Sequence, residues 1–228
     1  EGCFFMNKPN KKIILFVNGD LPEPGNLQSK INKADFLVAV DGGLKHITNL
    51  HLTPNLIIGD LDSADQEQVE HFRSQGVEVR KYPVDKDETD LELALDSAIE
   101  MHPSKIWIVA AIGNRVDQTL GNIFLLTRED LANTDLRLVD GVREIFIVRS
   151  SAVLTGKPGQ RVSLLPLMSK VTGIHTQGLK YPLKNETLYP DKTRGISNQM
   201  TSPRAEVTIA SGLLLCIHDI SEPGQRSS

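Results

Sequence analysis

Short apolar runs rich in β-branched residues alternate with segments of helical period over about the first 140 residues of the chain. The apolar runs lie at residues 12–17, 36–40, 55–58, 77–80, 105–110 and 135–139. The segments that predict helices lie between them, at residues 26–32, 44–50, 64–74, 89–101 and 116–128. Strands that are apolar almost throughout, each followed by a helix, are typical of βαβ units in a parallel sheet covered on both faces. We therefore expect an α/β domain with a parallel sheet.

The pattern changes after about residue 142. Strand-like runs at residues 145–148, 161–165, 173–176, 205–210 and 213–218 are separated by Gly, Pro and Asn, without a strong helical period. Spacing of this kind predicts a small antiparallel β-sandwich. The expected domains are residues 6–141 and 142–224. Residues 1–5 precede Met6, and the sequence does not show whether they are native, so they are left out of the fold prediction.

Composition excludes several classes of protein. The chain has 25 Lys and Arg against 29 Asp and Glu, so it lacks the basic surface that nucleic-acid binding needs. Cys3 and Cys216 lie at opposite ends and form neither a zinc spacing nor a disulfide framework. The apolar runs are too short to span a bilayer, and no signal peptide is visible. We expect a cytoplasmic protein with no membrane or nucleic-acid partner.

Acidic residues follow four of the predicted parallel strands. The segments are Asp41-Gly42-Gly43, Gly59-Asp60-Leu61-Asp62-Ser63, Lys86-Asp87-Glu88-Thr89-Asp90 and Gly113-Asn114-Arg115-Val116-Asp117-Gln118. The carboxyl ends of parallel strands meet at one edge of the sheet, which is where ligands bind in open α/β folds. Neither a P-loop lysine motif nor a dinucleotide Gly-x-Gly-x-x-Gly is present. The negative charge of bound phosphates would therefore be neutralised by a metal ion and by Arg115.

Asp60 and Asp62 flank a single residue, Leu61. In an extended segment, side chains at positions i and i+2 point the same way, so two carboxylates would face one cleft and repel each other unless a cation lay between them. Carboxylate oxygens together with substrate phosphates suit Mg²⁺. The alternative is plain turn chemistry, because a single Asp at a strand end usually caps a helix. We favour the metal for this pair, and Asp90 strengthens that interpretation.

Helix caps explain other polar residues near these segments. Thr89-x-x-Glu92 and Ser63-x-x-Gln66 have the spacing of capping boxes, which open the helices predicted at 89–101 and 64–74. We assign the remaining acidic residues near these helices to caps and turns; they are Asp65, Asp85 and Asp96.

Taken in order, the four acidic segments resemble the motifs of the thiamine pyrophosphokinase family. Two later segments, Thr176-Gln177-Gly178-Leu179-Lys180-Tyr181-Pro182-Leu183 and Gly195-Ile196-Ser197-Asn198, resemble its thiamine-side segments, so the similarity covers residues 12–218. The resemblance implies an enzyme that transfers a pyrophosphoryl group from ATP to the hydroxyl of thiamine, giving thiamine diphosphate and AMP. It also implies an ATP- and Mg²⁺-binding catalytic domain at 6–141, a thiamine-binding sandwich at 142–224, and a homodimer with thiamine at the subunit interface.

The resemblance carries residue roles with it. It implies that Mg²⁺ and the phosphates are held by Asp60, Asp62 and Asp90. It places the phosphate chain near Thr89, Arg115, Asp117 and Gln118. It assigns the nucleotide cleft to Asp41, Gly42 and Gly43. It implies a thiamine site lined by Tyr181, Ser197 and Asn198. Either Asp117 or Asp62 could accept the hydroxyl proton, and the sequence does not choose between them.

Three other functions remain open from the residues alone. Asp60-Leu61-Asp62 also matches the metal-binding Asp-x-Asp of nucleotide-sugar glycosyltransferases, although the other acidic segments would then be unexplained. A non-catalytic nucleotide or thiamine sensor would be expected to lack the metal carboxylates, which are all present. A structural or interaction module would bind no ligand in the cleft.

Overall fold

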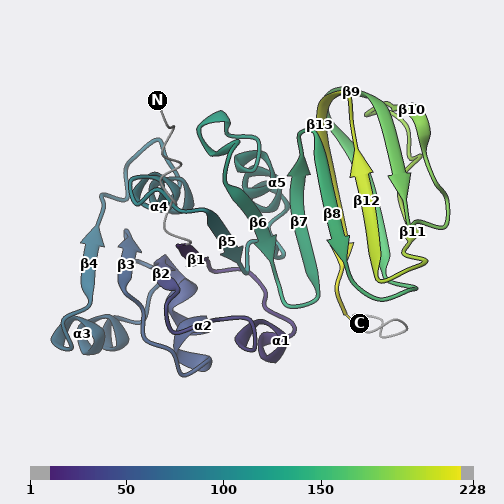
Figure 1. Cartoon of the computed structure of the whole chain (residues 1–228). Helices are drawn as coiled ribbons and strands as arrows, with labels where there is room; N and C mark the ends of the chain where they lie inside the picture. The colour runs from purple at the N-terminus through teal and green to yellow at the C-terminus, as the bar shows by residue number, and fades with distance from the viewer. Residues whose placement is uncertain (1–10, 222–228) are drawn as a thin grey trace, which may run out of the picture. The chain divides into compact units, whose positions relative to one another are not determined.

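The computed structural model describes residues 11–221, and Cys3 and residues 1–5 lie outside them. The chain divides into two compact units between Asp140 and Gly141 (Figure 1). The strands of the N-terminal unit are β1 (Lys12–Phe16), β2 (Phe36–Val40), β3 (Leu56–Gly59), β4 (Glu78–Lys81), β5 (Lys105–Val109) and β6 (Asp135–Val139). Its helices are α1 (Pro24–Gln28), α2 (Leu44–Asn49), α3 (Gln66–Ser74), α4 (Asp90–Ile99) and α5 (Val116–Leu125).

The N-terminal sheet has the strand order β4-β3-β2-β1-β5-β6, and all neighbouring strands in it are parallel. The chain adds strands outward from β1 to β4, then crosses back to place β5 on the other side of β1. Figure 1 shows α1, α2 and α3 on one side of this sheet and α4 and α5 on the other. Because every strand is parallel, all of the loops that follow the strands lie at one edge, called here the carboxyl edge.

Burial on both faces explains why these strands are apolar almost throughout. β1, β2 and β5 each have four buried residues in a row after a half-buried first residue. Ile14 and Phe16 pack in one cluster with Ile47 of α2 and Phe72 of α3. Trp107 of β5 is 7% exposed and belongs to the same cluster. Continuous apolar runs are what a sheet covered on both faces requires.

The C-terminal unit consists of strands. They are β7 (Arg143–Val148), β8 (Ser151–Thr155), β9 (Arg161–Gln177), β10 (Lys184–Leu188), β11 (Asn198–Gln199), β12 (Arg204–Thr208) and β13 (Ser211–Asp219). The first half of β9 pairs with β13, which pairs with β7; its second half pairs with β10 and β12, and β12 pairs with β8. The two sheets therefore share one long strand, and these pairings are antiparallel.

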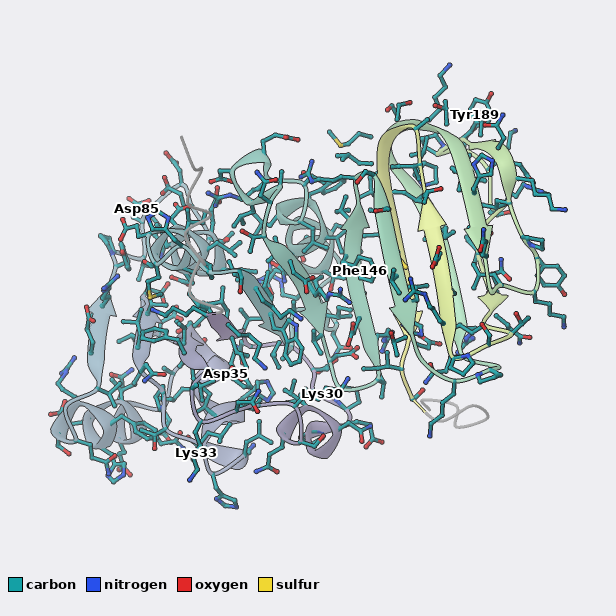
Figure 2. All side chains as sticks on the ribbon, viewed as in Figure 1. Lys30, Lys33, Asp35, Asp85, Phe146 and Tyr189 are labelled. Atoms are coloured by element: carbon teal, nitrogen blue, oxygen red, sulfur yellow. The ribbon has the colours of Figure 1, made fainter. Side chains whose placement is uncertain are left out.

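β9 changes sheets where its backbone bends at Met168, an exposed residue with φ of 65°. Between the two sheets lies a core that includes Phe146 of β7, which Figure 2 labels, together with Leu164 of β9 and Cys216 of β13. The predicted fold class, a parallel-sheet α/β domain followed by an antiparallel β-sandwich, is confirmed. Within residues 11–221, no helix is both long enough and apolar enough to cross a bilayer.

Two of the predicted caps and turns are wrong. Asp96 lies inside α4 and pairs with Arg128 at 2.7 Å. Ser63 does not cap α3; the cap is Asp65, whose carboxylate accepts hydrogen bonds from the backbone N–H of Glu67 (3.0 Å) and Gln68 (3.3 Å). Thr89 does cap α4, because its Oγ1 accepts a hydrogen bond from the N–H of Glu92 at 3.2 Å. Both caps were predicted from the same Ser/Thr-x-x-Glu/Gln spacing. At α3, however, the helix begins later and Asp65, two residues after Ser63, is the cap.

Candidate active site at the carboxyl edge

Three carboxylates meet at the carboxyl edge of the N-terminal sheet. One oxygen from each of Asp41, Asp60 and Asp62 lies within 4.8 Å of the other two. Asp41 follows β2, and Asp60 and Asp62 follow β3, so two adjacent strands bring them together. We call these three residues the acidic group.

The loops that carry the acidic group have an unusual backbone conformation. Asp41 has φ of 48° and Leu61 has φ of 64°, both in the left-handed region that side chains other than Gly rarely adopt. The segment from Asp60 to Asp62 is therefore a turn, in which the N–H of Asp62 donates to the Asp60 carboxylate at 3.0 Å. The prediction of an extended segment is wrong, although the two carboxylates converge. Strained backbone of this kind gathers at functional sites.

Two glycines allow the loops to pack closely. A Cβ on Gly43 would lie 1.9 Å from the carbonyl oxygen of Phe16, so the loop after β2 can rest against the end of β1 only because that atom is missing. A Cβ on Gly42 would lie 2.6 Å from Cγ of Asn18. Both glycines therefore make room for the end of β1 and the loop that follows it. That they also line a nucleotide cleft stays a prediction.

Asn18 connects the acidic group to α2, and sequence reasoning missed it. Its amide nitrogen donates to Ser63 Oγ at 3.4 Å, and Ser63 Oγ donates to the Asp41 carboxylate. Its amide oxygen accepts a hydrogen bond from Lys45 Nζ at 2.7 Å. The available signal was position, because Asn18 follows β1 just as the predicted acidic residues follow their strands.

A hydrogen bond between the Asp62 and Asp60 carboxyls raises the pKa of Asp62. The negative charge of Asp60, desolvation and the negative charge of Asp41 add to this rise. Oδ1 of Asp41 is buried and has no hydrogen-bond partner within the described residues. A buried acceptor without a donor and like charges held together are both unfavourable unless a cation is supplied.

Lys86 supplies a positive charge beside Asp60 and Asp90. Its Nζ lies 2.9 Å from Asp90 Oδ1 and 3.9 Å from Asp60 Oδ2, and it donates to the carbonyl oxygen of Pro83 at 3.0 Å. The side chain of Lys86 is only 12% exposed. Asp90 therefore joins the acidic group through Lys86, and Thr89 beside it caps α4.

Arg115 and Asp117 form a separate pair after β5. Arg115 donates to the Asp117 carboxylate from Nη2 at 2.6 Å and from Nε at 3.3 Å, and both side chains are 67% exposed. The hydrogen bond from Arg115 lowers the pKa of Asp117. Gln118 is exposed beside them on α5. Across residues 11–221, no hydrogen bond or ion pair links these three residues to the acidic group.

The predicted thiamine residues meet in the C-terminal unit. Asn198, which is 4% exposed, accepts hydrogen bonds from the backbone N–H of Tyr181 (3.0 Å) and Gln199 (2.9 Å) and donates to the Tyr181 carbonyl at 2.7 Å. Tyr181 itself is 61% exposed. Ser197 is exposed, has φ of 59°, and is held by a hydrogen bond from its N–H to Ser163 Oγ at 3.0 Å. Asn198 thus positions Tyr181; contact of all three predicted residues with thiamine stays a prediction.

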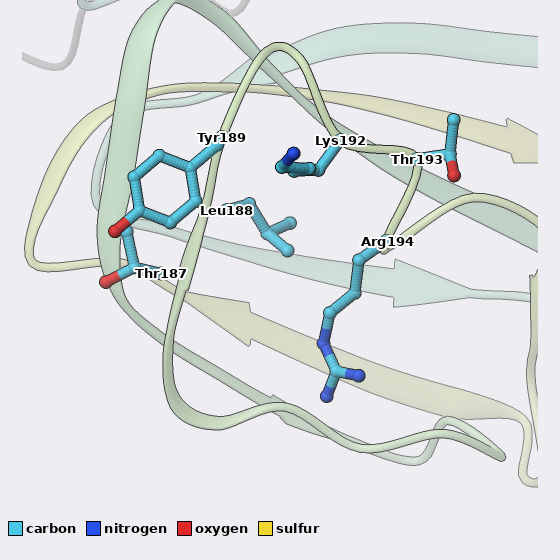
Figure 3. A pocket seen from close by; sticks show the side chains of 6 residues that line it. All are labelled: Thr187, Leu188, Tyr189, Lys192, Thr193 and Arg194. Atoms are coloured by element: carbon cyan, nitrogen blue, oxygen red, sulfur yellow. The ribbon is translucent and has the colours of Figure 1, made fainter.

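A pocket of about 370 Å³ lies beside the end of β10 (Figure 3). Its lining is Thr187, Leu188, Tyr189, Lys192, Thr193 and Arg194. Glu186 already neutralises Arg194 through two hydrogen bonds of 2.6 and 2.7 Å. None of the six lining residues was predicted to bind thiamine, and sequence patterns gave no signal for them.

The acidic group fits a divalent cation. Mg²⁺ prefers oxygen ligands at about 2.0–2.1 Å, so two ligands on opposite sides of it stand about 4 Å apart. The oxygens of the acidic group, within 4.8 Å of one another, need only a small movement to reach that spacing. The unpartnered Oδ1 of Asp41 and the crowding that raises the pKa of Asp62 are both relieved by a cation.

Fold and site together define a class: a two-domain protein in which an open parallel α/β sheet carries a carboxylate site suited to a divalent cation, followed by a β-sandwich. Two family models match the chain. "Thiamin pyrophosphokinase, catalytic domain" matches residues 27–139, and "Thiamin pyrophosphokinase, vitamin B1 binding domain" matches residues 149–214. The chain therefore belongs to the thiamin pyrophosphokinase family, which confirms the resemblance and the prediction of an enzyme.

Known relatives agree with this assignment. The chain is 30% identical over 182 residues to a thiamine pyrophosphokinase of Bacillus subtilis (strain 168), covering 79% of this chain and 85% of the relative. A crystal structure of thiamine pyrophosphokinase from Bacillus subtilis superposes with a TM-score of 0.82 at 26% identity, covering 93% of this chain and 99% of that one. A thiamin pyrophosphokinase structure from Geobacillus thermodenitrificans gives a TM-score of 0.80 at 25% identity, with coverage of 94% and 98%.

Proposed function

We propose that this chain transfers a pyrophosphoryl group from ATP to the hydroxyl of thiamine, forming thiamine diphosphate and AMP. The observation that carries the site assignment is the acidic group, three carboxylates with oxygens within 4.8 Å of one another at the carboxyl edge. Membership of the thiamin pyrophosphokinase family supports the choice of substrates. The glycosyltransferase alternative leaves the match to the vitamin B1 binding domain without a role.

In the N-terminal unit, some residues would neutralise the charge of the phosphates and others would hold those residues in position. Mg²⁺ would be held by the acidic group together with Asp90, and when bound it supplies positive charge that offsets the charge of the phosphates. Thr89 fixes the start of α4, so that Asp90 has a defined place. Arg115 offers a planar pair of N–H donors that suits a phosphate. To bind a phosphate, Arg115 would release the Asp117 carboxylate that it now contacts.

The transfer itself needs an in-line arrangement. The hydroxyl oxygen of thiamine attacks the β-phosphorus of ATP, the bond from that phosphorus to the bridging oxygen of the α-phosphate breaks, and AMP leaves on the opposite side. The hydroxyl proton passes to a carboxylate. Asp62 and Asp117 are the two candidates, and their surroundings differ: the neighbouring Asp60 carboxyl raises the pKa of Asp62, while the hydrogen bond from Arg115 lowers that of Asp117.

In this proposal the C-terminal unit binds thiamine. The exposed ring of Tyr181 would stack on an aromatic ring of thiamine, and Ser197 would offer its hydroxyl. Asn198 fixes the backbone of Tyr181 through its buried amide. A homodimer with thiamine at the subunit interface and a cytoplasmic location belong to the same proposal, and light scattering and cell fractionation test them.

An activity assay tests the function directly. The protein is incubated with thiamine, ATP and Mg²⁺, and AMP and thiamine diphosphate are separated by chromatography. Equal amounts of the two products are expected. Asp62→Asn should lower turnover at least about 100-fold, because charge stabilisation worth several kcal/mol is lost. Wild-type protein that forms neither product, or an Asp62→Asn variant with near-normal turnover and an unchanged circular dichroism spectrum, would contradict the proposal.

A further inference from the structure

Lys86 occupies the position of a cation between two carboxylates. Its ammonium lies 2.9 Å from Asp90 Oδ1 and 3.9 Å from Asp60 Oδ2. A third oxygen, the carbonyl of Pro83, accepts a hydrogen bond from it at 3.0 Å. The side chain is only 12% exposed, and its three contacts define one place for the charge.

Helix stability does not explain this placement. Lys86 precedes the first residue of α4 by four positions, and a positive charge near a helix N-terminus is unfavourable because the amide dipoles there already carry positive charge. Thr89 supplies the cap of α4 without help from Lys86. What Lys86 does offset is the negative charge of Asp90 and of Asp60, and Asp60 stands beside two further carboxylates, Asp41 and Asp62.

We propose that Lys86 is the resident counter-ion of the unloaded site, and that it leaves Asp60 and Asp90 when a divalent cation enters and then faces the phosphate chain of the nucleotide. This proposal rests on the proposed function. A divalent cation needs the same oxygens that Lys86 now contacts, so the two compete. Lys86 therefore weakens binding of the bare metal and favours binding of metal and nucleotide together, because only the phosphates give its ammonium a new partner.

The test measures metal affinity without turnover. Mn²⁺ is titrated into nucleotide-free protein by calorimetry for wild type, Lys86→Met, Lys86→Arg and Lys33→Met. Lys86→Met keeps a long apolar side chain without the charge, and Lys86→Arg keeps the charge. Lys33→Met controls for net charge, since Lys33 is exposed and lies at the opposite end of the N-terminal unit from Asp85 of the Lys86 loop (Figure 2).

Lys86→Met should bind Mn²⁺ about tenfold more tightly than wild type, which corresponds to about 1.4 kcal/mol. The same variant should bind the Mg²⁺ complex of an unreactive ATP analogue several-fold more weakly, whereas Lys86→Arg and Lys33→Met stay close to wild type for Mn²⁺. Unchanged or weaker Mn²⁺ binding by Lys86→Met would overturn the proposal. Failure of all four proteins to bind Mn²⁺ would overturn it together with the metal site itself.

Lysine acylation of wild-type protein, read by mass spectrometry, gives a test that does not depend on the folding of a variant. Labelling of Lys86 should rise when Mn²⁺ is added alone and fall again with the Mg²⁺ complex of the ATP analogue, relative to Lys33. Labelling that Mn²⁺ leaves unchanged, in protein shown by calorimetry to bind it, would refute displacement. The proposed function would then still stand if the wild-type protein forms thiamine diphosphate and AMP.

Discussion

Replacing Asp41 by Asn should stabilise the ligand-free protein and at the same time abolish its response to a divalent cation. The carboxylate oxygens of Asp41 and Asp60 lie within 4.8 Å of each other. Two like charges at that distance repel by roughly 1 kcal/mol at the dielectric constant of water and by about 3.5 kcal/mol at an effective constant of 20. We take the lower value as the minimum effect, because Asp41 and Asp60 are half-buried and so lie between these two limits.

The substitution is mild in every other respect. Asn tolerates the left-handed backbone that Asp41 adopts at φ of 48°, and its amide oxygen can still accept the hydrogen bond from Ser63. For a chain of this size, 1 kcal/mol raises the unfolding midpoint by about 2–4 °C. Metal binding to the folded state would raise the midpoint of wild-type protein further, and this second rise should be missing in Asp41→Asn.

Thermal unfolding followed by circular dichroism, at low salt, measures both effects. In chelator, Asp41→Asn should unfold about 2–4 °C above wild type, and added salt should shrink the difference through screening. Asp85→Asn removes one charge from the exposed loop after β4 and serves as the control (Figure 2). An Asp41→Asn variant that unfolds below wild type in chelator, or one that Mg²⁺ stabilises as much as wild type, would refute the reasoning.

Other predictions concern pH, thiamine and loop packing. Burial lowers the pKa of His46, which hydrogen-bonds the Gly19 carbonyl at 3.0 Å, so its stabilising effect is complete above the unfolded pKa of about 6.5 and is lost as pH falls below it. From about pH 7 to about pH 5 the unfolding midpoint should fall more steeply for wild type than for His46→Gln. Tyr181→Ala should raise the KM for thiamine about tenfold or more and leave that for ATP unchanged; equal increases for both would contradict this division. Gly43→Ala should destabilise by more than about 2 kcal/mol in urea unfolding, since a Cβ there meets the Phe16 carbonyl at 1.9 Å, and a smaller loss would contradict the packing.

The sequence predicted the buried parallel strands well because their physical signal is strong. The runs expected at residues 36–40 and 135–139 match β2 and β6 to the residue. These strands are covered on both sides or nearly so, and continuous burial leaves a continuous apolar run. Helix α4 was predicted nearly to its ends, since its apolar period and its Thr89 cap agree.

Strands in the sandwich were harder to predict. β8 and β10 were missed, because Ser151–Thr155 and Lys184–Leu188 have mostly exposed or half-buried side chains, and Leu188 is the one apolar residue of β10. β9 was expected as two short strands, and it is one strand of 17 residues that bends at Met168 as it passes between sheets. A bend of that kind depends on partners far away in the sequence, which local patterns do not contain.

The candidate site was predicted in part. Asp41, Asp60 and Asp62 were selected because each follows a predicted strand, and the structure brings them together. However, Asp41 was assigned to the nucleotide cleft and not to the metal ligands, and the turn at Leu61 was missed. The links made by Asn18 and Ser63 could not be predicted, because they join loops after different strands through side chains whose directions depend on the strained turns.

The central claim is that the carboxylates at the carboxyl edge hold a divalent cation, and crystals grown with Mn²⁺ and an unreactive ATP analogue test it most directly. We expect an anomalous-scattering peak bonded to oxygens of Asp60 and Asp62 and to the phosphates of the analogue. A peak bonded elsewhere on the chain, or phosphates bound at this edge with no metal beside these carboxylates, would contradict it.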